Sequence, residues 1–505
     1  MTTTREPAAR WTLVLVCVAG ALMTLDITIL NIGLEQIATG LDATLPDLQW
    51  VVGVYPLVFA ALLLPAGSLS DRIGRRRMFI AGAAVFTASS VACGLATGPT
   101  ALTIARAVQG IGGAMTYAPA IPLLAEAFPP QRRPAAMGIF SGVSAGAAAV
   151  GPLVGGALVD TFGWRSMFFV NLLPGALLVA GAAIKIVESV VAQRIRRFDL
   201  PGTVLAIGVL FAVNYAVVAG ADNGWSSPDV VGSIIGAVVA LVAFLLVEGR
   251  SDDPMLDLRL FRIGSFSGAA LLSLLTRMLH LGTLSYFVLW LQGMLGYSPL
   301  QAGLRLLPFS AMAVVTSLLA GRLVGRLGLL PVLATGFVGM AAGFALLTRI
   351  GPDSPWTVAL VGFFVLGAAA GLLFPPLITI SVGVVPPEHS GMASGLMNSF
   401  FPLGTALGVS TFGAVLSARV QAGMTDAALA AAGLPDDVQD PVRVAVAAGR
   451  FGELPGLTGG SAEAAELAKT AFANGIATVS LVSLGLALLG GLVAVLTVRN
   501  RQLRT

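Results

Sequence analysis

The sequence has little charge and very few cysteines and histidines. Only 11% of its 505 residues are charged, against about 25% in soluble domains. So few charges cannot cover a water-exposed surface of this size, so most of the surface must face lipid. Cys17 and Cys93 lie inside apolar stretches, which argues against a disulfide framework and favours small buried side chains. His280 and His389 lie far apart without ligand-like neighbours, so we expect no metal site.

Several functional signatures are also missing. The formal charge of +4 is spread over many short polar segments, which argues against a nucleic-acid partner. Neither a GxxxxGK[ST] phosphate loop nor an HExxH motif occurs, so transport driven by ATP on this chain is disfavoured. We expect no cofactor. An enzyme would need a nucleophile and base, and a receptor would need a soluble effector domain; neither is evident.

Long apolar stretches recur along the whole chain and predict an all-α integral membrane protein. Their length and the short polar loops between them favour helical hairpins over the alternating ten-residue strands of a membrane barrel. The first stretch reaches from Trp11 to Ile32, long enough to be a retained helix rather than a signal peptide. We predict fourteen spans: 11–33, 48–68, 78–97, 100–124, 135–158, 167–187, 200–220, 229–248, 265–292, 299–321, 329–349, 356–381, 391–417 and 473–497.

The distribution of basic residues predicts the orientation. Most of the 29 lysine and arginine residues fall in segments that share one side if the N-terminus is cytoplasmic. Both termini are therefore expected in the cytoplasm. The loop 418–472 would then be external, either folded as a small cap or simply variable. The basic segment 188–199 would be a cytoplasmic linker.

A carboxylate stands deep inside the first apolar stretch. Asp26 is separated around the helix from a polar stripe made by Thr24, Thr28, Asn31 and Glu35. Ionisable groups in membrane spans are rare, costly and usually functional. Burial favours the neutral form of a carboxyl, so Asp26 is a candidate for proton uptake and release. The alternative is an ion pair with a structural partner.

A glycine- and arginine-rich turn follows the second span. Its glycines suit a tight turn, and Asp71 can pair with Arg72 or Arg75, with Glu126 as a further partner. A shorter run, 321–328, follows the tenth span, which indicates a parallel repeat of two six-helix halves with two extra helices between them. The residues expected to act in conformational switching here are Gly67, Asp71, Arg72, Gly74, Arg75, Arg76 and Glu126.

Two more motifs lie in the fourth and fifth spans. Arg106 at membrane depth needs a carboxylate or a watery cavity, and shares a helix face with Gln109. In the fifth span, the small residues and the proline predict close helix contact and a kink. That motif consists of Gly151, Pro152, Gly155 and Gly156.

Together these motifs resemble the Major Facilitator Superfamily, in particular its fourteen-span drug:proton antiporter family (EmrB/QacA type), and the resemblance covers nearly the whole chain. It implies two six-helix bundles rocking about a central site, with proton influx driving export. It assigns proton transfer to Arg106, a conformational role to the arginine turn, and antiport to the fifth-span motif. Where the family commonly has Arg-Gln in the thirteenth span, this chain has Phe401 and Pro402.

The expected organisation and partners follow from this resemblance. Residues 1–187 would form the first bundle, 188–199 the linker, 200–250 the extra helices and 251–505 the second bundle. We expect a monomer in a bacterial cytoplasmic membrane that uses the proton gradient to export small lipophilic or cationic compounds. Export of a lipid, a siderophore or another metabolite is the alternative. The candidate substrate-cavity residues are Tyr55, Phe59, Tyr117, Arg277, Tyr286, Trp290, Asn398 and Phe400.

Overall fold

The computed structural model describes residues 5–129, 132–188, 199–222, 224–251, 254, 258–383 and 390–498. Within these ranges the chain is helical and contains no strand. The first group of helices comprises α1 (Arg5–Ile32), α2 (Leu34–Gly40), α3 (Leu45–Ile73), α4 (Arg75–Gly94), α5 (Pro99–Tyr117), α6 (Ala120–Ala127), α7 (Arg133–Phe162), α8 (Ser166–Phe169) and α9 (Leu172–Lys185). The helices α10 (Leu200–Asp222) and α11 (Pro228–Arg250) follow.

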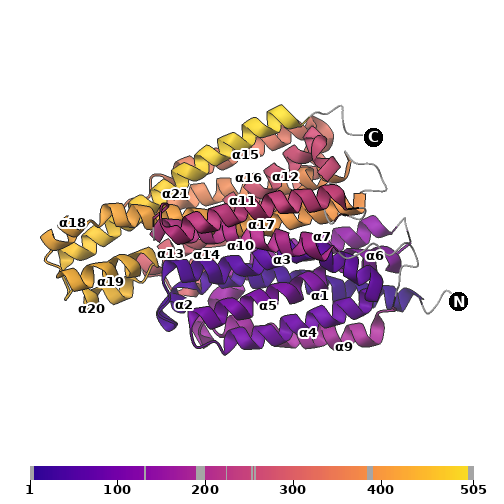
Figure 1. Cartoon of the computed structure of the whole chain (residues 1–505), viewed down its shortest axis with the longest axis horizontal. Helices are drawn as coiled ribbons and strands as arrows, with labels where there is room; N and C mark the ends of the chain where they lie inside the picture. Colours follow the sequence, from indigo (N-terminus) through magenta and orange to yellow (C-terminus); the bar gives the residue numbers. More distant parts are fainter. Residues whose placement is uncertain are drawn as a thin grey trace.

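The remaining elements belong to a second group. They are η1 (Leu258–Arg262), α12 (Gly264–Arg277), η2 (Met278–Gly282), α13 (Leu284–Leu289), η3 (Trp290–Met294), α14 (Pro299–Leu327), α15 (Leu329–Leu347), α16 (Thr357–Gly383), α17 (Ser390–Gly423), α18 (Asp426–Ala431), α19 (Asp436–Ala447), η5 (Phe451–Glu453), α20 (Leu454–Leu457) and α21 (Ala462–Thr497). Helices α1 to α9 pack mainly on one another, and so do α12 to α21 (Figure 1). We call these groups the N-terminal half and the C-terminal half.

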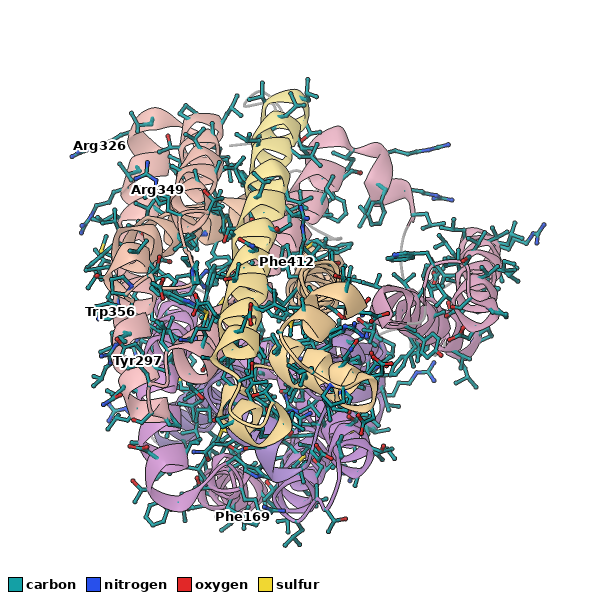
Figure 2. The ribbon with its side chains drawn as sticks, turned by 90° about the vertical axis from the view of Figure 1, so that its left-hand side faces the viewer. Phe169, Tyr297, Arg326, Arg349, Trp356 and Phe412 are labelled. Atoms are coloured by element: carbon teal, nitrogen blue, oxygen red, sulfur yellow. The ribbon has the colours of Figure 1, made fainter. Side chains whose placement is uncertain are left out.

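The two halves meet along two helix pairs, α7 with α14 and α3 with α17. Helices α10 and α11 pack together, and α10 contacts both α3 and α17, so this pair lies beside the junction of the halves. Viewed along the bundle in Figure 2, α10 and α11 stand out at the right-hand edge, away from α14 and α15. The two extra helices therefore border the junction without separating the halves.

Corresponding helices of the two halves begin and end alike. Helix α3 starts with a capping box in which Thr44 and Asp47 bond reciprocally, and α14 starts with the same motif from Ser298 and Gln301. The two helices end at Gly74 and Gly328, with φ of 105° and 86°, values that favour glycine. These matched ends support the internal repeat seen in the sequence.

Twelve helices of the described residues are long and apolar enough to cross a membrane, or thirteen if the bent α7 counts as one span. The predicted number of fourteen is therefore not confirmed by this criterion. The predicted span 100–124 is interrupted, since α5 ends at Tyr117 and α6 begins at Ala120. Pro119 between them has no backbone N–H to continue the helix. In α7, the segments Gly142–Ala148 and Val150–Phe162 meet at 43°, just before Pro152, where a proline disrupts the preceding turn.

The segment predicted as the external loop 418–472 is mostly helical. Helix α17 runs on to Gly423, and α21 begins at Ala462, so both helices extend into the predicted loop. Residues 424–461 hold α18, α19, η5 and α20, and we call them the cap. In Figure 1 the cap projects at one end of the bundle, and the beginning of α1 and the end of α21 lie at the other. The predicted linker 188–199 lies outside the described residues, apart from its two end positions.

Candidate transport site

Asp26 lies inside the N-terminal half in an enclosed polar cluster. Its Oδ2 is 2.6 Å from Nη1 of Arg106, and both side chains are almost fully buried. Its Oδ1 accepts hydrogen bonds from Gln109 Nε2 at 3.0 Å and Asn171 Nδ2 at 2.8 Å. Arg106 also donates to the side-chain oxygen of Gln109 at 2.6 Å, and Gln109 donates to Ser90 at 2.7 Å. Three helices, α1, α4 and α5, and the α8–α9 junction thus meet in one cluster around the Asp26 carboxylate.

This cluster supplies what a buried charge needs. An isolated ion in the membrane interior is costly, whereas a paired and hydrogen-bonded one is tolerated. Asp26 and Arg106, predicted separately from two motifs, are brought together here. Asn171 was not predicted to take part, although an amide within an apolar stretch was a usable signal.

A cavity of about 340 Å³ lies between the two halves, next to this cluster. Tyr55 forms the boundary: its ring lines the cavity, and the guanidinium carbon of Arg106 lies 4.5 Å from the centre of that ring. Asp26 itself does not line the cavity, whereas Thr24 and Thr28 do. The ion pair therefore lies one side chain behind the cavity wall.

The wall on the N-terminal side is a row of aromatic rings. Neighbouring ring centres lie 6.1 Å apart for Tyr55 and Phe59, 5.7 Å for Phe59 and Tyr117, and 6.0 Å for Tyr117 and Phe140. Small residues allow this row to form. A Cβ on Gly113 would lie 2.9 Å from the Tyr55 hydroxyl and 3.0 Å from the Phe59 ring. The row offers flat apolar surface to a ligand.

The wall on the C-terminal side combines aromatic rings with basic side chains. Arg277 lies at the end of α12, with its guanidinium carbon 4.3 Å from the ring centre of Phe374. His280 stacks on Phe309, with ring centres 4.5 Å apart and planes 13° apart. A turn of π-helix, a form frequent at functional sites, carries His280. Phe309 and Phe374 gave no sequence signal because they stand in uniformly apolar stretches.

Four of the predicted cavity residues, Tyr55, Phe59, Tyr117 and Arg277, line this cavity. Three others do not line it. Tyr286 and Trp290 are buried in the packing core of the C-terminal half, where the Tyr286 hydroxyl donates to the carbonyl of Val409. Phe400 packs edge-on against Phe261, with ring centres 6.5 Å apart. Spacing along a helix placed these residues in membrane spans without saying which face met the cavity. The side chain of Asn398 lies outside the described residues.

The halves are joined at the cap end of the cavity. Ser285 donates to the side-chain oxygen of Asn31 at 2.5 Å, and Gln292 donates to the carbonyl of Ile32 at 2.7 Å. Arg450 of the cap pairs with Asp42 of the N-terminal half at 2.5 Å. These contacts close the cap end in this conformation.

The fifth-span motif contributes to this closure on two faces of α7. On one face, a Cβ at Gly151 would lie 2.0 Å from Oγ1 of Thr28, so α1 passes against it within the same half. On the other face, a Cβ at Gly156 would lie 2.6 Å from Cα of Leu300 in α14. Gly155 also packs on α1, and the carbonyl of Pro152 would lie 2.3 Å from a Cβ on Gly303. Gly303, not predicted as a site residue, thus faces Pro152 across the junction, one turn before the contact of Gly156 with Leu300.

The arginine turn holds together the opposite end of the N-terminal half. Arg75 bonds Asp71 at 3.0 Å and also pairs with Glu126, linking α3, α4 and α6. The backbone at position 74 has a φ of 105°, a conformation that favours glycine there. Gly67, by contrast, has no atom within 4 Å of a Cβ built on it, so no close approach requires a glycine there in this conformation.

Two further arginines of this turn are partly buried. Arg76 donates through Nε to the carbonyl of Ala182 at 3.2 Å and through its backbone N–H to Glu188 at 3.2 Å, which ties α4 to the end of α9. Arg72 is half-buried near the end of α3.

Glu35 on α2 is an acidic side chain outside the spans that lies close to Glu453 of the cap. Burial, and secondly the nearby carboxylate of Glu453, raise the pKa of Glu35 on α2 above its ordinary value. A proton is therefore held more readily at this position while the cap is closed.

The motifs, the cavity and the close packing of two similar halves agree with the comparison to known sequences. The profile described as Major Facilitator Superfamily matches residues 16–409 and 266–498. The chain belongs to the Major Facilitator Superfamily. As a superfamily member it is a multi-pass membrane protein and a secondary transporter rather than an enzyme.

Curated relatives within the superfamily cover most of the chain. It is 38% identical over 400 residues to "Multidrug resistance protein Stp" of Mycobacterium tuberculosis, covering 79% of this chain and 74% of that protein. It is 33% identical over 410 residues to the "Tetracenomycin C resistance and export protein" of Streptomyces glaucescens, covering 81% and 76%. A solved bacterial homolog of the human lysosomal transporter Spinster, inward-facing and occupied, superposes with a TM-score of 0.65 at 17% identity over 99% of both chains, which shows the superfamily fold.

Proposed function

We propose that this chain exports small lipophilic compounds across the bacterial cytoplasmic membrane in exchange for protons. The observation that carries the proposal is the placement of a buried carboxylate–arginine pair one side chain behind an aromatic cavity between two halves. The names of the relatives, multidrug resistance and antibiotic export proteins, support export and this class of substrate. Fourteen spans, cytoplasmic termini and a monomeric state are part of the proposal.

Proton coupling would run through Asp26 and Arg106. Protonation of Asp26 removes the charge that holds Arg106, and the guanidinium is then free to move toward the Tyr55 ring at the cavity wall. Neither member can leave the cluster alone without exposing an uncompensated buried charge. Protonation and the shape of the cavity wall would thereby be linked.

Conformational switching would use the glycine contacts of α7 at the cap end and the charged turn at the other. Opening at the cap end requires Gly156 to part from Leu300 and Arg450 to part from Asp42. The cluster of Asp71, Arg75 and Glu126 would stabilise the conformation open at the cap end. The boundaries 1–187, 200–250 and 251–505 describe the proposed moving units and the extra pair.

The test separates coupling from binding. Asp26→Asn keeps the side-chain volume and a hydrogen-bond acceptor but cannot lose a proton. In proteoliposomes we expect this variant to lose uphill efflux of a fluorescent dye under an imposed pH gradient while it still exchanges dye at equal concentrations on both sides. Asp437→Asn, a matched change of an exposed acid in the cap, should keep gradient-driven efflux. Gradient-driven efflux by Asp26→Asn at the wild-type rate would refute the coupling role.

A further inference from the structure

His280 stands in the cavity wall with a hydrogen-bonding ring that no described protein group uses. The side chain lines the cavity and is only 8% exposed. Its Nδ1 is fully enclosed without a hydrogen-bond partner, whereas Nε2 remains accessible. Buried polar groups are usually paired, so an unpaired imidazole at the wall of a cavity indicates a place for a ligand atom.

The imidazole is fixed in direction by aromatic neighbours. It stacks on Phe309 with ring centres 4.5 Å apart, and it meets Phe374 edge-on with ring centres 5.5 Å apart. Phe309 is itself held by close packing, since a Cβ on Gly367 of α16 would lie 2.0 Å from the Phe309 carbonyl oxygen. The ring cannot turn without losing these contacts, so the direction of its accessible edge is set before a ligand arrives.

The position of the ring proton follows from the surroundings of the two nitrogens. An imidazolium here would be a buried charge, which is costly without an acidic partner; among the lining residues that the structure describes, none is aspartate or glutamate. A neutral imidazole has one donor and one acceptor nitrogen. Orphaned buried N–H groups are rarer than orphaned acceptors, which puts the lone pair on enclosed Nδ1 and the proton on Nε2. His280 thus offers the cavity an N–H donor.

Several hydroxyl groups of the opposite wall are directed elsewhere. Thr24 donates to the carbonyl of Gly20 at 2.8 Å, and Thr28 donates to the carbonyl of Thr24 at 3.2 Å, so both protons are used within α1. The ring of Tyr55 lines the cavity, but its hydroxyl faces α5, 2.9 Å from a Cβ built on Gly113. This wall therefore presents mainly flat apolar surface, and the His280 donor lies across from it.

We propose that His280 is a specificity-determining residue that selects neutral, flat aromatic substrates with a carbonyl oxygen at the edge of the ring system. The Nε2–H of His280 donates to that oxygen, and the rings lie against the aromatic row of the N-terminal side. This inference rests on the proposed export function but concerns binding alone. A ligand whose edge group can only donate gains nothing from this N–H, and an apolar ligand binds through ring contacts only.

Three ligands of one tricyclic shape test the idea. Fluorenone has a carbonyl acceptor at the central position, carbazole has an N–H donor there, and fluorene has neither. Binding to the full chain in lipid nanodiscs is measured by equilibrium dialysis, without any gradient, at about pH 8, where an ordinary imidazole is neutral. Each affinity is corrected for partition into empty nanodiscs. We expect fluorenone to bind about 2- to 10-fold more tightly than fluorene, as one neutral hydrogen bond allows, and carbazole no more tightly than fluorene.

Two variants assign this preference. His280→Phe keeps a ring that can stack on Phe309 but removes the N–H, so fluorenone should bind it no better than fluorene. Tyr286→Phe is the control, because it also removes one polar group from an aromatic ring. Tyr286 lies in the packing core, its hydroxyl donates to the carbonyl of Val409, and it does not line the cavity. This control should keep the wild-type preference for fluorenone.

A spectroscopic signature separates hydrogen bonding from an effect of cavity shape. In isotope-edited infrared difference spectra, the carbonyl band of bound fluorenone should lie at lower frequency in the wild type than in His280→Phe. An unshifted band, a full fluorenone preference in His280→Phe, or an equal loss in Tyr286→Phe would overturn the inference. Loss of carbazole affinity in His280→Phe would overturn it as well, because Nε2 would then be an acceptor. Failure of gradient-driven efflux would leave these binding results unaffected, so the two proposals can fail separately.

Discussion

The contact of Gly156 with α14 allows a direct test of how the halves move. A Cβ at this position would lie 2.6 Å from both Cα of Leu300 and the carbonyl oxygen of Pro299. Carbon atoms in good contact are about 3.5–4.0 Å apart, so Gly156→Ala must push α7 and α14 apart by about 1 Å. Overpacking of this kind costs about 1–3 kcal/mol. The cost falls on the conformation closed at the cap end, because the two backbones belong to different halves.

The expected result is a shift of the population toward opening at the cap end, by about 5- to 150-fold. Ser285→Cys reports it, because Ser285 is buried at the closed end against Asn31. The labelling rate with a bulky maleimide is measured in nanodiscs, on a background in which Cys17 and Cys93 are replaced by serine. Introduced into the Ser285→Cys protein, Gly156→Ala should raise the maleimide labelling rate by about 5- to 150-fold.

Two glycines of the same helix serve as controls. Gly146 has no atom within 4 Å of a built Cβ, so Gly146→Ala should leave the rate unchanged. Gly151 faces Thr28 of its own half, so Gly151→Ala should lower the melting temperature without raising the labelling rate. Wild-type labelling by Gly156→Ala, or an equal increase in Gly146→Ala, would refute the assignment of this contact to the closure between halves.

Three further predictions concern the cap end. Arg450→Gln removes the ion pair between the cap and the N-terminal half. Because the partner carboxylate of Asp42 is 90% exposed, the labelling rate of Ser285→Cys should rise by less than about fivefold. A larger rise would show that the pair dominates closure. Burial, and secondly Glu453 of the cap, raise the pKa of Glu35 in the closed conformation. The part of this shift that depends on the closed cap stabilises closure in acid and is lost as the pH rises through the raised pKa. The labelling rate, normalised to free cysteine, should therefore increase with pH, and Glu35→Gln should remove that part of the pH dependence. On intact cells an impermeant thiol reagent should label Asp437→Cys in the cap but not Arg326→Cys at the opposite end, and the reverse pattern would invert the proposed orientation.

Much of the architecture followed from composition and spacing. Low charge and recurrent apolar stretches are sufficient for an all-helical membrane protein, because lipid tolerates only backbones that satisfy their own hydrogen bonds. The repeat was readable because similar glycine- and arginine-containing turns follow the second and tenth predicted spans, where α3 and α14 end. The family itself was readable from local motifs, which report backbone needs such as the positive φ of Gly74.

The predictions differed from the structure where the sequence does not specify which neighbours a side chain meets or where a helix breaks. Tyr286 and Trp290 were placed at the cavity because aromatic rings in spans suit both a ligand and a packed core. The continuous span at 100–124 missed the break at Pro119 because its composition stays apolar across the break. In both cases hydropathy records depth in the membrane and not which neighbour a side chain meets.

The sequence by itself determined that Asp26 and Arg106 are buried charges that need partners, because their cost in a membrane span does not depend on the fold. Only the tertiary structure decided that they are each other's partners, 2.6 Å apart, and that Tyr55 separates them from the cavity. It also decided that Arg277 faces that cavity and that Gly156 meets the other half while Gly151 meets its own. These facts depend on how helices distant in the chain pack together, and helical periodicity assigns a residue to a face without naming what lies opposite.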